Sequence, residues 1–342
     1  MTTNLSFSRD VSLQPYNTFG IAAQANYFLS IADIDQLRAL RADPVLAAMP
    51  RLILGGGSNL VLSDQVDALV LKMDLLGKSI VGEDVDFVYV QAQAGENWHT
   101  FVQWTLALGL GGLENLSLIP GTVGAAPIQN IGAYGMEVQD ALFQLEAFDF
   151  ATGEMLVLDK AACQFAYRDS IFKHALKDRV AITSVQFALP KQWQPKLGYA
   201  DVARYLQVQA ISAPSPRAIS DAIIAIRQAK LPDPQVIGNA GSFFKNPLVS
   251  AAQRDALLLT YPDLVSYPQA SGECKLAAGW LIERCGWKGK NLGRAGVYEK
   301  QALVLVNRGG ASGAEVRALA QAVQADVLAK FAVTLEVEPV FV

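Results

Sequence analysis

Residues 119–135 read IPGTVGAAPIQNIGAYG, and this stretch decides how the chain folds and what it can hold. It is rich in small residues and carries no charge, and Gln129 and Asn130 precede the aromatic residue Tyr134. Small residues let a backbone approach a flat ring and a pyrophosphate closely, and neutral amides can hydrogen-bond to ring edges. A buried glycine-rich crossover is the alternative, but the length and the lack of charge favour contact with a ligand.

The uncharged stretch extends over residues 115–136, a length that raises the question of a membrane span. Pro120, Pro127 and four glycines interrupt it, and it lacks the sustained apolarity of a membrane helix. The N-terminus lacks the basic start and apolar run of a signal peptide. We therefore expect a cytoplasmic protein without a membrane span, in which this stretch is a buried loop around a ligand.

A second glycine run, GGGSN, occupies residues 55–59, directly after the apolar residues RLIL. Glycines let the backbone approach closely, and successive N–H groups form an anion-binding nest. The run is neither G-x-G-x-x-G nor a Walker loop, so the common dinucleotide and P-loop patterns do not apply. Taken alone, such a run is more often merely a tight turn.

Length and composition define the class of protein. The 342 residues predict two or three compact units, and 51% hydrophobic with 18% charged residues predict sizeable cores. A net charge of −4 argues against a nucleic-acid binder, although a few local cations suffice for an anionic small molecule. Cys163, Cys274 and Cys285 lack Cys-x-x-Cys spacing and only two histidines are present, so we expect reduced thiols and no metal site.

The pattern of apolar residues predicts an α+β fold without regular βαβ alternation. Helices are predicted at 96–108, 216–230, 274–285 and 313–330, the second with Ser215 as N-cap and the last with a capping box from Ser312 and Glu315. A linker-like stretch at 211–216 marks a boundary before the second of them. Strands are predicted at 51–54, 68–73, 85–94, 143–150, 180–188 and 302–306, and over the C-terminal residues 334–342.

Two side chains outside the glycine runs are suited to chemistry. Arg168, in YRDSIFK at 167–173, is a permanently charged fork that suits a carboxylate or a developing enolate, although a structural ion pair is the commoner use of arginine. Ser242, in NAGSFFKNP at 239–247, lies between a glycine and two aromatic residues and can donate a proton; a structural turn serine is the alternative. The chain has no G-x-S-x-G motif, which disfavours a serine hydrolase.

Glu336 and Glu338 lie two residues apart on the predicted C-terminal strand. We expect their side chains on one face of it, about 7 Å apart. A solvated pair on an exposed face is the usual explanation for such a pattern. Pro339 holds Glu338 in an extended conformation and removes a backbone donor, which indicates a sheet edge or end.

Taken together, these segments resemble the UDP-N-acetylenolpyruvoylglucosamine reductase family. The resemblance covers nearly the whole chain, and an ordered set of this kind is far more specific than any one string. In order along the chain, the matching segments are NTFG at 17–20, GGGSN, AGENWH at 94–99, GLENL at 112–116, residues 119–135, YRDSIFK, KLPDP at 230–234, GNAGSFFKNP, KLAAGWLIE at 275–283 and LEVE at 335–338.

The resemblance implies an FAD-binding module of the vanillyl-alcohol-oxidase/PCMH type and a C-terminal α+β substrate domain. FAD-binding subdomain 1 would span residues 1–70 and subdomain 2 residues 71–214, with the final strand 331–342 returning to it; residues 215–330 would bind substrate. FAD would be bound non-covalently, by Gly55, Gly56, Gly57, Ser58, Asn59, Ile119, Pro120, Gly121, Thr122, Gly124, Ala125, Ile128, Gly132 and Tyr134.

The activity that the resemblance implies is the NADPH-dependent reduction of UDP-N-acetylglucosamine enolpyruvate to UDP-N-acetylmuramate, in peptidoglycan precursor synthesis. NADPH would reduce FAD and leave, and the sugar nucleotide would then take hydride at its methylene carbon. Arg168 and Glu338 would flank the substrate carboxylate, and Ser242 would protonate the carbanionic carbon. The nucleotide sugar would be held by Arg227, Lys230, Asn246 and Gln301 in a monomeric protein.

Tyr199, within LGYADVARYL at 197–206, resembles the tyrosine that closes over the substrate in one subgroup of the family. One departure is that Pro339-Val340 follows Glu338 where the family usually has Val-Arg.

Two other functions fit parts of the pattern. A related FAD oxidase often attaches flavin to a His or Cys, which both glycine-rich segments lack, and a nucleotide-sugar sensor would not need Arg168, Ser242 and Glu338 together.

Overall fold

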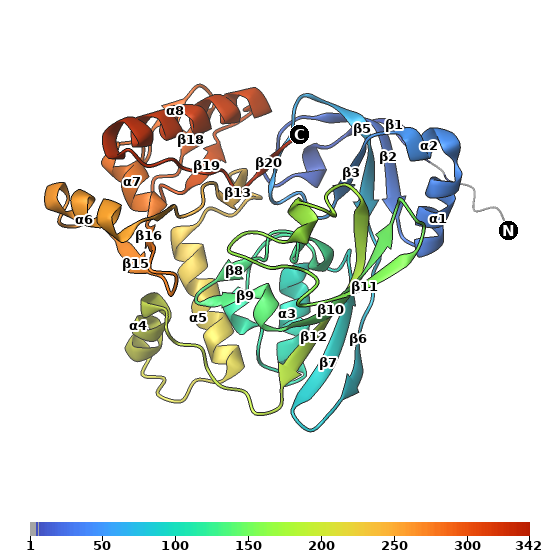
Figure 1. Ribbon diagram of the computed structural model, residues 1–342, viewed down its shortest axis with the longest axis horizontal. Coiled ribbons are helices and arrows are strands. Elements are labelled where there is room, and N and C mark those ends of the chain that lie inside the picture. The colour runs from blue at the N-terminus through green and yellow to red at the C-terminus, as the bar shows by residue number, and fades with distance from the viewer. Residues whose placement is uncertain (1–4, 6) are drawn as a thin grey trace. The chain divides into compact units, whose positions relative to one another are not determined.

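The computed structural model describes residue 5 and residues 7–342 of the chain. The first of two compact units contains the described residues up to 11 with 25–56 and 67–229, and the second contains 12–24, 57–66 and 230–342. Each unit combines helices with strands, which confirms the predicted α+β class (Figure 1). No helix in the described part of the chain is both long and apolar enough to cross a membrane.

A four-stranded sheet in the first unit has the order β1-β2-β5-β3. Its strands are β1 (Ser8–Ser12), β2 (Gln24–Ile31), β5 (Gln65–Met73) and β3 (Arg51–Leu54), and the last two run parallel. Helices α1 (Ile34–Ala42) and α2 (Pro44–Ala48) connect β2 to β3, and Asp33 and Asp43 cap their N-termini. The GGGSN run therefore follows β3 directly, as predicted.

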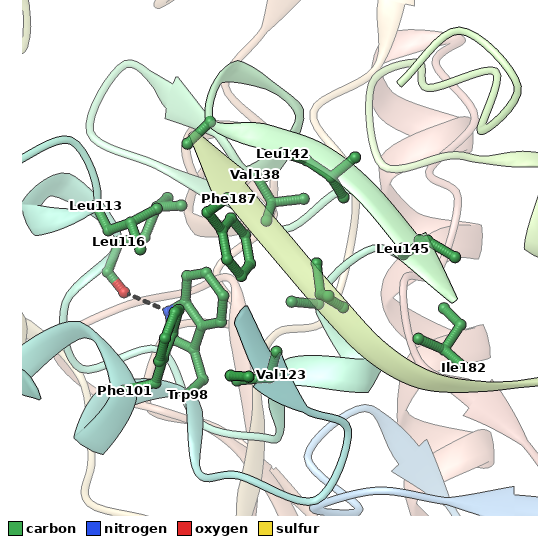
Figure 2. Close-up of a cluster of buried hydrophobic side chains, with 14 of the residues drawn as sticks. Trp98, Phe101, Leu113, Leu116, Val123, Val138, Leu142, Leu145, Ile182 and Phe187 are labelled. Atoms are coloured by element: carbon green, nitrogen blue, oxygen red, sulfur yellow. Dashed lines mark hydrogen bonds between the residues drawn. The ribbon is translucent and has the colours of Figure 1, made fainter. Parts of the chain in front are cut away.

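A five-stranded antiparallel sheet forms the larger part of the first unit, in the order β11-β10-β12-β7-β6. Its strands are β6 (Lys78–Glu83), β7 (Phe87–Gln93), β10 (Leu142–Asp149), β11 (Met155–Asp159) and β12 (Val180–Pro190). Helix α3 (Trp98–Ala107) buries Trp98, Phe101 and Val102 in the same core as the inward side chains of this sheet. Figure 2 shows this core, in which the Trp98 indole donates a hydrogen bond to the Leu116 carbonyl at 2.9 Å.

The core of Figure 2 fixes the long uncharged segment, because that segment contributes to it. Leu116, Val123, Ala126 and Met136 are buried there beside α3 and the sheet. The segment itself folds into short turns, η2 (Glu114–Leu116) and η3 (Val123–Ala125), and the small hairpin β8 (Gly132–Ala133) and β9 (Met136–Glu137). The expectation of a largely buried loop is confirmed.

Two helices complete the first unit. Helix α5 (Pro216–Lys230) begins where Ser215 and Pro216 predicted, and the Ser215 hydroxyl accepts from Ala218 N–H at 3.2 Å. Helix α4 (Ala200–Val208) packs Val202 and Leu206 against Ile219 and Ile223 of α5. The segment at 197–206, which contains Tyr199, is therefore helical from Ala200 onward.

Two sheets of the second unit have three or four strands. One has the order β13-β19-β18-β17, from β13 (Asn239–Ser242), β19 (Val304–Asn307), β18 (Ala295–Val297) and β17 (Asn291–Leu292), and α8 (Gly313–Phe331) packs on the last three. The other has the order β14-β16-β15, from β14 (Leu248–Val249), β16 (Cys274–Leu276) and β15 (Ser266–Pro268), and is followed by α7 (Ala278–Arg284). Helix α6 (Ala251–Thr260) lies beside β16, and β4 (Leu60–Val61) pairs in parallel with β20 (Val340–Phe341).

Two predicted elements of this unit are wrong in part. The helix predicted at 274–285 begins only at Ala278, because Cys274–Leu276 pairs with strands on both sides as β16. The continuous strand predicted at 334–342 is reduced to β20 and an isolated bridge between Val337 and Phe244. Pro339 lies between the two, and its missing N–H explains why the ladder is interrupted there.

Candidate active site

Gly55 and Gly56 lie against Gly121 and Thr122 in the first unit. A Cβ atom at Gly55 would stand 2.5 Å from Thr122 Oγ1, and one at Gly56 would stand 2.8 Å from the Cα of Gly121. Either substitution would force backbone or a buried side chain to move, so this approach of the two segments requires glycine. Two stretches about 65 residues apart in sequence thus pack together through glycine and small side chains.

Strained backbone and buried polar groups mark the 119–135 segment and the residue before it. Leu118, Asn130 and Tyr134 have positive φ angles of 59°, 46° and 49°, an uncommon conformation for residues with a side chain. The hydroxyl of Thr122 is buried without a hydrogen-bond partner among the described residues. Buried hydroxyls are normally bonded, so the Thr122 hydroxyl is a candidate hydrogen-bond donor to a ligand.

Asn130 was expected to hydrogen-bond to the edge of a ligand ring, but the structure gives its side chain a different role. Its Nδ2 donates to Glu137 Oε2 at 2.7 Å and to the Ala166 carbonyl at 3.0 Å, and its Oδ1 accepts from Gln139 N–H at 3.1 Å. The fully buried amide therefore holds protein groups together, instead of offering hydrogen bonds to a ring edge. The bridge that it makes to Ala166 connects the 119–135 segment to the turn that carries Arg168.

Arg168 lies in a tight turn closed by backbone pairing of Ala166 with Asp169, and its φ angle is 54°. Its Nη2 donates to the carbonyl of Gly132 at 2.7 Å, and Lys173 Nζ donates to the Arg168 carbonyl at 3.1 Å. The guanidinium is thus fixed beside the hairpin at the end of the 119–135 segment. The structure brings Arg168 together with that segment in the first unit.

A cluster of aromatic and cationic side chains lies next to the same segment. The rings of Tyr134 and Tyr199 meet edge to face with centroids 5.0 Å apart. Burial lowers the pKa of the Arg227 guanidinium, and the hydroxyl of Tyr134 beside it opposes that effect. The Nε of Arg227 is buried and has no hydrogen-bond partner within the described ranges. A desolvated cation with an open donor is suited to an anionic ligand group.

His99, the last residue of the AGENWH segment, makes a specific contact. Its Nδ1 accepts a hydrogen bond from Leu118 N–H at 2.9 Å, at the residue with strained backbone before the glycine-rich segment. Burial, followed by the nearby charge of Arg227, lowers the pKa of His99, which keeps the ring neutral and Nδ1 able to accept. Nothing in the sequence around His99 indicated this contact.

Ser242 and Glu338 come together in the second unit. Ser242 ends β13 opposite Val304, and the N–H of Glu338 donates to the carbonyl of Phe243 at 2.9 Å. Asn59, the last residue of GGGSN, donates from Nδ2 to the Glu338 carbonyl at 3.2 Å. One main-chain hydrogen bond and one from the Asn59 side chain therefore hold the segment after Ser242, the Glu338 backbone and one end of the glycine run together.

The two C-terminal glutamates occupy different environments, contrary to the expected shared face. Glu336 is exposed and pairs with Lys245, whereas only 9% of Glu338 is exposed. The interruption of the strand around Val337 and Pro339 explains why residues two apart differ in burial. The difference favours Glu338 as the functional carboxyl.

Asn246 and Gln301, both expected to bind substrate, lie at the start of α7. Asn246 Oδ1 accepts from Ala278 N–H at 3.0 Å, and Gln301 Oε1 is 3.1 Å from the position that a Cβ of Gly279 would take. Lys230 is the last residue of α5. The structure thus brings Asn246 and Gln301 to one place in the second unit, while Tyr199 and Arg227 belong to the first.

Known proteins resemble this chain over its whole length. Residues 25–159 match the model of the FAD binding domain, and residues 233–342 match that of the C-terminal domain of UDP-N-acetylenolpyruvoylglucosamine reductase. The UDP-N-acetylenolpyruvoylglucosamine reductase of Burkholderia cenocepacia (strain HI2424) is 58% identical over 338 residues, which are 98% of this chain and 97% of that protein. The enzyme of the same name from Paraburkholderia phymatum is 57% identical over 98% of each chain.

A solved structure has the same fold. The crystal structure of UDP-N-acetylenolpyruvylglucosamine reductase (MurB) from Thermus caldophilus superimposes with a TM-score of 0.68 at 24% identity, covering 99% of this chain and 98% of that one. The fold thus joins a PCMH-type FAD-binding domain to a MurB C-terminal domain. With more than half of its residues identical to such enzymes over nearly its full length, this chain belongs to the UDP-N-acetylenolpyruvoylglucosamine reductase family.

Proposed function

We propose that this chain uses NADPH and FAD to reduce UDP-N-acetylglucosamine enolpyruvate to UDP-N-acetylmuramate, a step in peptidoglycan precursor and cell wall synthesis. The observation that carries the proposal is the 58% identity to a UDP-N-acetylenolpyruvoylglucosamine reductase over 98% of this chain. The match of residues 25–159 to an FAD binding domain and of 233–342 to the reductase C-terminal domain supports it from both parts of the chain.

Residues of the two glycine-rich segments fit FAD. The contact between Gly55–Gly56 and Gly121–Thr122 creates a neutral surface of backbone groups, and the unpaired Thr122 hydroxyl offers a donor to it. We assign the pyrophosphate to the GGGSN residues 55–59, and the flavin ring to Ile119, Pro120, Gly121, Thr122, Gly124, Ala125, Ile128, Gly132 and Tyr134. Neither segment contains a histidine or cysteine, which supports non-covalent binding.

Three side chains would carry the chemistry on the substrate. Bound FAD, once reduced by NADPH, supplies the hydride that adds to the methylene carbon of the enolpyruvyl group. Arg168 neutralises the charge that accumulates on the substrate carboxylate, and Glu338, protonated in the complex, hydrogen-bonds to the enolate form. Ser242 then gives its hydroxyl proton to the carbon that bears the ether oxygen. Its fixed backbone near Glu338 supports this pairing of roles.

The nucleotide sugar would be held by the residues that the family resemblance implies for it. The buried, incompletely bonded guanidinium of Arg227 supports contact with a phosphate, and we assign Lys230, Asn246 and Gln301 to the rest of the UDP-sugar. Tyr199 is 43% exposed and packs edge to face on Tyr134. We propose that it closes over the substrate, which would place this chain in the subgroup with a tyrosine on the substrate loop.

The functional division of the chain remains part of the proposal. We assign residues 1–70 and 71–214, with the final strand 331–342, to FAD, and residues 215–330 to substrate. This division follows expected ligand roles, whereas the two compact units follow contacts within the fold. We further propose a monomer that acts in the cytoplasm, where its nucleotide substrates are made.

The proposed function is tested by identifying the product. Purified protein with FAD, NADPH and UDP-N-acetylglucosamine enolpyruvate should consume one NADPH for each sugar nucleotide converted. Mass spectrometry should show a product that carries two additional hydrogen atoms, as UDP-N-acetylmuramate does. Consumption of NADPH without any change in the mass of the sugar nucleotide would refute the assigned reaction and favour a flavin oxidase.

A further inference from the structure

We propose that Thr18 is a positioning residue that holds the Ser242 strand in the geometry needed for proton transfer. The inference rests on the proposed function, because it concerns the residue that protonates the substrate. Thr18 lies in the NTFG segment at 17–20, to which no role was assigned from sequence. All residues in the argument belong to the second unit.

Thr18 makes two hydrogen bonds to the main chain of Asn239, the first residue of β13. Its hydroxyl donates to the carbonyl of Asn239 at 2.7 Å, and its own carbonyl accepts from Asn239 N–H at 2.9 Å. Asn239 is 3% exposed, so neither main-chain group can turn to water if a bond is lost. A hydroxyl is required for the first of these bonds, and only threonine or serine can supply it from this position.

Asn239 transmits this constraint to Ser242 through a bulge in β13. The Asn239 side chain accepts from Gly241 N–H at 2.9 Å and donates to the carbonyls of Ile237 and Pro232 at 2.9 and 3.2 Å. The register of β13 against β19 shifts between Asn239 and Ser242, and Gly241 has a φ angle of 70° within the shift. Bulges of this kind redirect the side chains that follow them, so Asn239 determines the direction of Ser242.

Thr18 can act as an anchor because its own segment is held rigidly. The buried Asn17 side chain donates to the carbonyls of Leu13 and Ile21 and accepts from Ile21 N–H, at 2.8, 3.0 and 2.9 Å. Thr18 N–H donates to the carbonyl of Gly57 at 3.2 Å, inside the GGGSN run. One residue thus connects the glycine run to the strand of the proton donor.

The decisive variant is Thr18→Val, which keeps the shape of the side chain and removes only the donor to Asn239. We expect it to slow the reoxidation of reduced flavin by UDP-N-acetylglucosamine enolpyruvate on the order of 10-fold, because a proton donor moved by a fraction of an ångström loses efficiency. The bleaching of the flavin by NADPH needs no proton from Ser242 and should stay within about 2-fold of wild type. Thr18→Ser restores the hydroxyl and should restore the reoxidation rate.

Anaerobic stopped-flow absorbance separates the two half-reactions, and measurements in H₂O and D₂O add a readout that a purely structural defect would not change. If Thr18 positions the proton donor, the solvent isotope effect on reoxidation rises in Thr18→Val, because proton transfer becomes more rate-limiting. Thr105→Val is the matched control, since the buried Thr105 hydroxyl likewise donates to a main-chain carbonyl, that of Val102, at 2.8 Å. It should change neither half-reaction.

Equal slowing of both half-reactions by Thr18→Val, or reoxidation at the wild-type rate and isotope effect, would overturn the positioning role. If this variant does not fold, Gly241→Ala tests the same bulge, because its Cβ meets no atom within 4 Å and strains only the φ angle; it must slow reoxidation selectively. A wild-type protein that is bleached by NADPH but not reoxidised would instead refute the proposed function. The two failures are therefore distinguishable.

Discussion

Gly57 is a position at which the small change from glycine to alanine should strongly destabilise the fold. Its φ angle is 59°, and a Cβ there would stand 2.0 Å from the Tyr16 carbonyl oxygen and 2.9 Å from the Cα of Asn17. The left-handed backbone costs a residue with a side chain about 1–2 kcal/mol, and forcing two packed backbone segments apart costs about 1–3 kcal/mol more. We therefore expect Gly57→Ala to lower the free energy of unfolding by about 2–5 kcal/mol.

Gly20 provides a matched control in the same unit. Its φ angle is 65°, but no atom lies within 4 Å of the position of its Cβ. Gly20→Ala should therefore cost only the backbone part, about 1–2 kcal/mol. Urea unfolding of both variants with saturating FAD, followed by tryptophan fluorescence, measures the difference. Equal destabilisation by the two substitutions would show that the contact with Tyr16 does not constrain Gly57, and the close packing of GGGSN against NTFG would be refuted.

Three further predictions concern the site and its supports. Tyr199→Ala should raise the Michaelis constant for the sugar nucleotide with little change in kcat, whereas Tyr199→Phe should keep the contact with Tyr134; an unchanged Michaelis constant in Tyr199→Ala would contradict closure over the substrate. Glu338→Gln should slow flavin reoxidation by more than about 10-fold, whereas Glu336→Gln, at an exposed site, should not; similar rates in the two variants would count against Glu338. Hydrogen bonds from Arg294 and the Ser312 backbone lower the pKa of Glu315 in the folded state from its ordinary value of 4.5 to about 2. The ionised Glu315 therefore contributes fully to stability above pH 4.5, and this contribution is lost as the pH falls toward 2. The difference in thermal midpoint between wild type and Glu315→Gln should shrink over that window, and a difference that stays constant would refute the assignment.

The parts of the fold that follow local rules could be predicted from sequence. The Ser312–Glu315 capping box locates the start of α8, and Ser215 with Pro216 locates the start of α5, because caps act over three or four residues. Cys274–Leu276 was wrongly predicted to be helical because its strand pairing depends on β14 and β15, which local patterns do not reveal. Pro339 was recognised as marking a sheet edge or end. The different burial of Glu336 and Glu338 could not be predicted from it, because burial depends on which segments pack against this part of the chain.

The site shows the same division between local and distant causes. GGGSN and residues 119–135 could each be interpreted from composition, since closeness to a ligand requires small residues. Other parts of the site depend on contacts between residues far apart in sequence, which local patterns do not reveal. These are the approach of Gly56 to Gly121, the hydrogen bond from Leu118 to His99 and the hydrogen bond from Thr18 to Asn239. Asn130 was assigned to ligand contact because its amide is neutral. Its hydrogen bonds to three protein groups show instead that it holds neighbouring segments together.

The central claim is that reduced flavin in this protein transfers hydride to the enolpyruvyl sugar nucleotide and that Ser242 supplies the proton. The most direct test mixes the flavoprotein anaerobically with NADPH and then with UDP-N-acetylglucosamine enolpyruvate, and follows the flavin band in wild type and Ser242→Ala. We predict bleaching in both proteins, and reoxidation that is at least ~10² slower in the variant. Equal slowing of bleaching and reoxidation, or reoxidation of Ser242→Ala at the wild-type rate, would contradict the account.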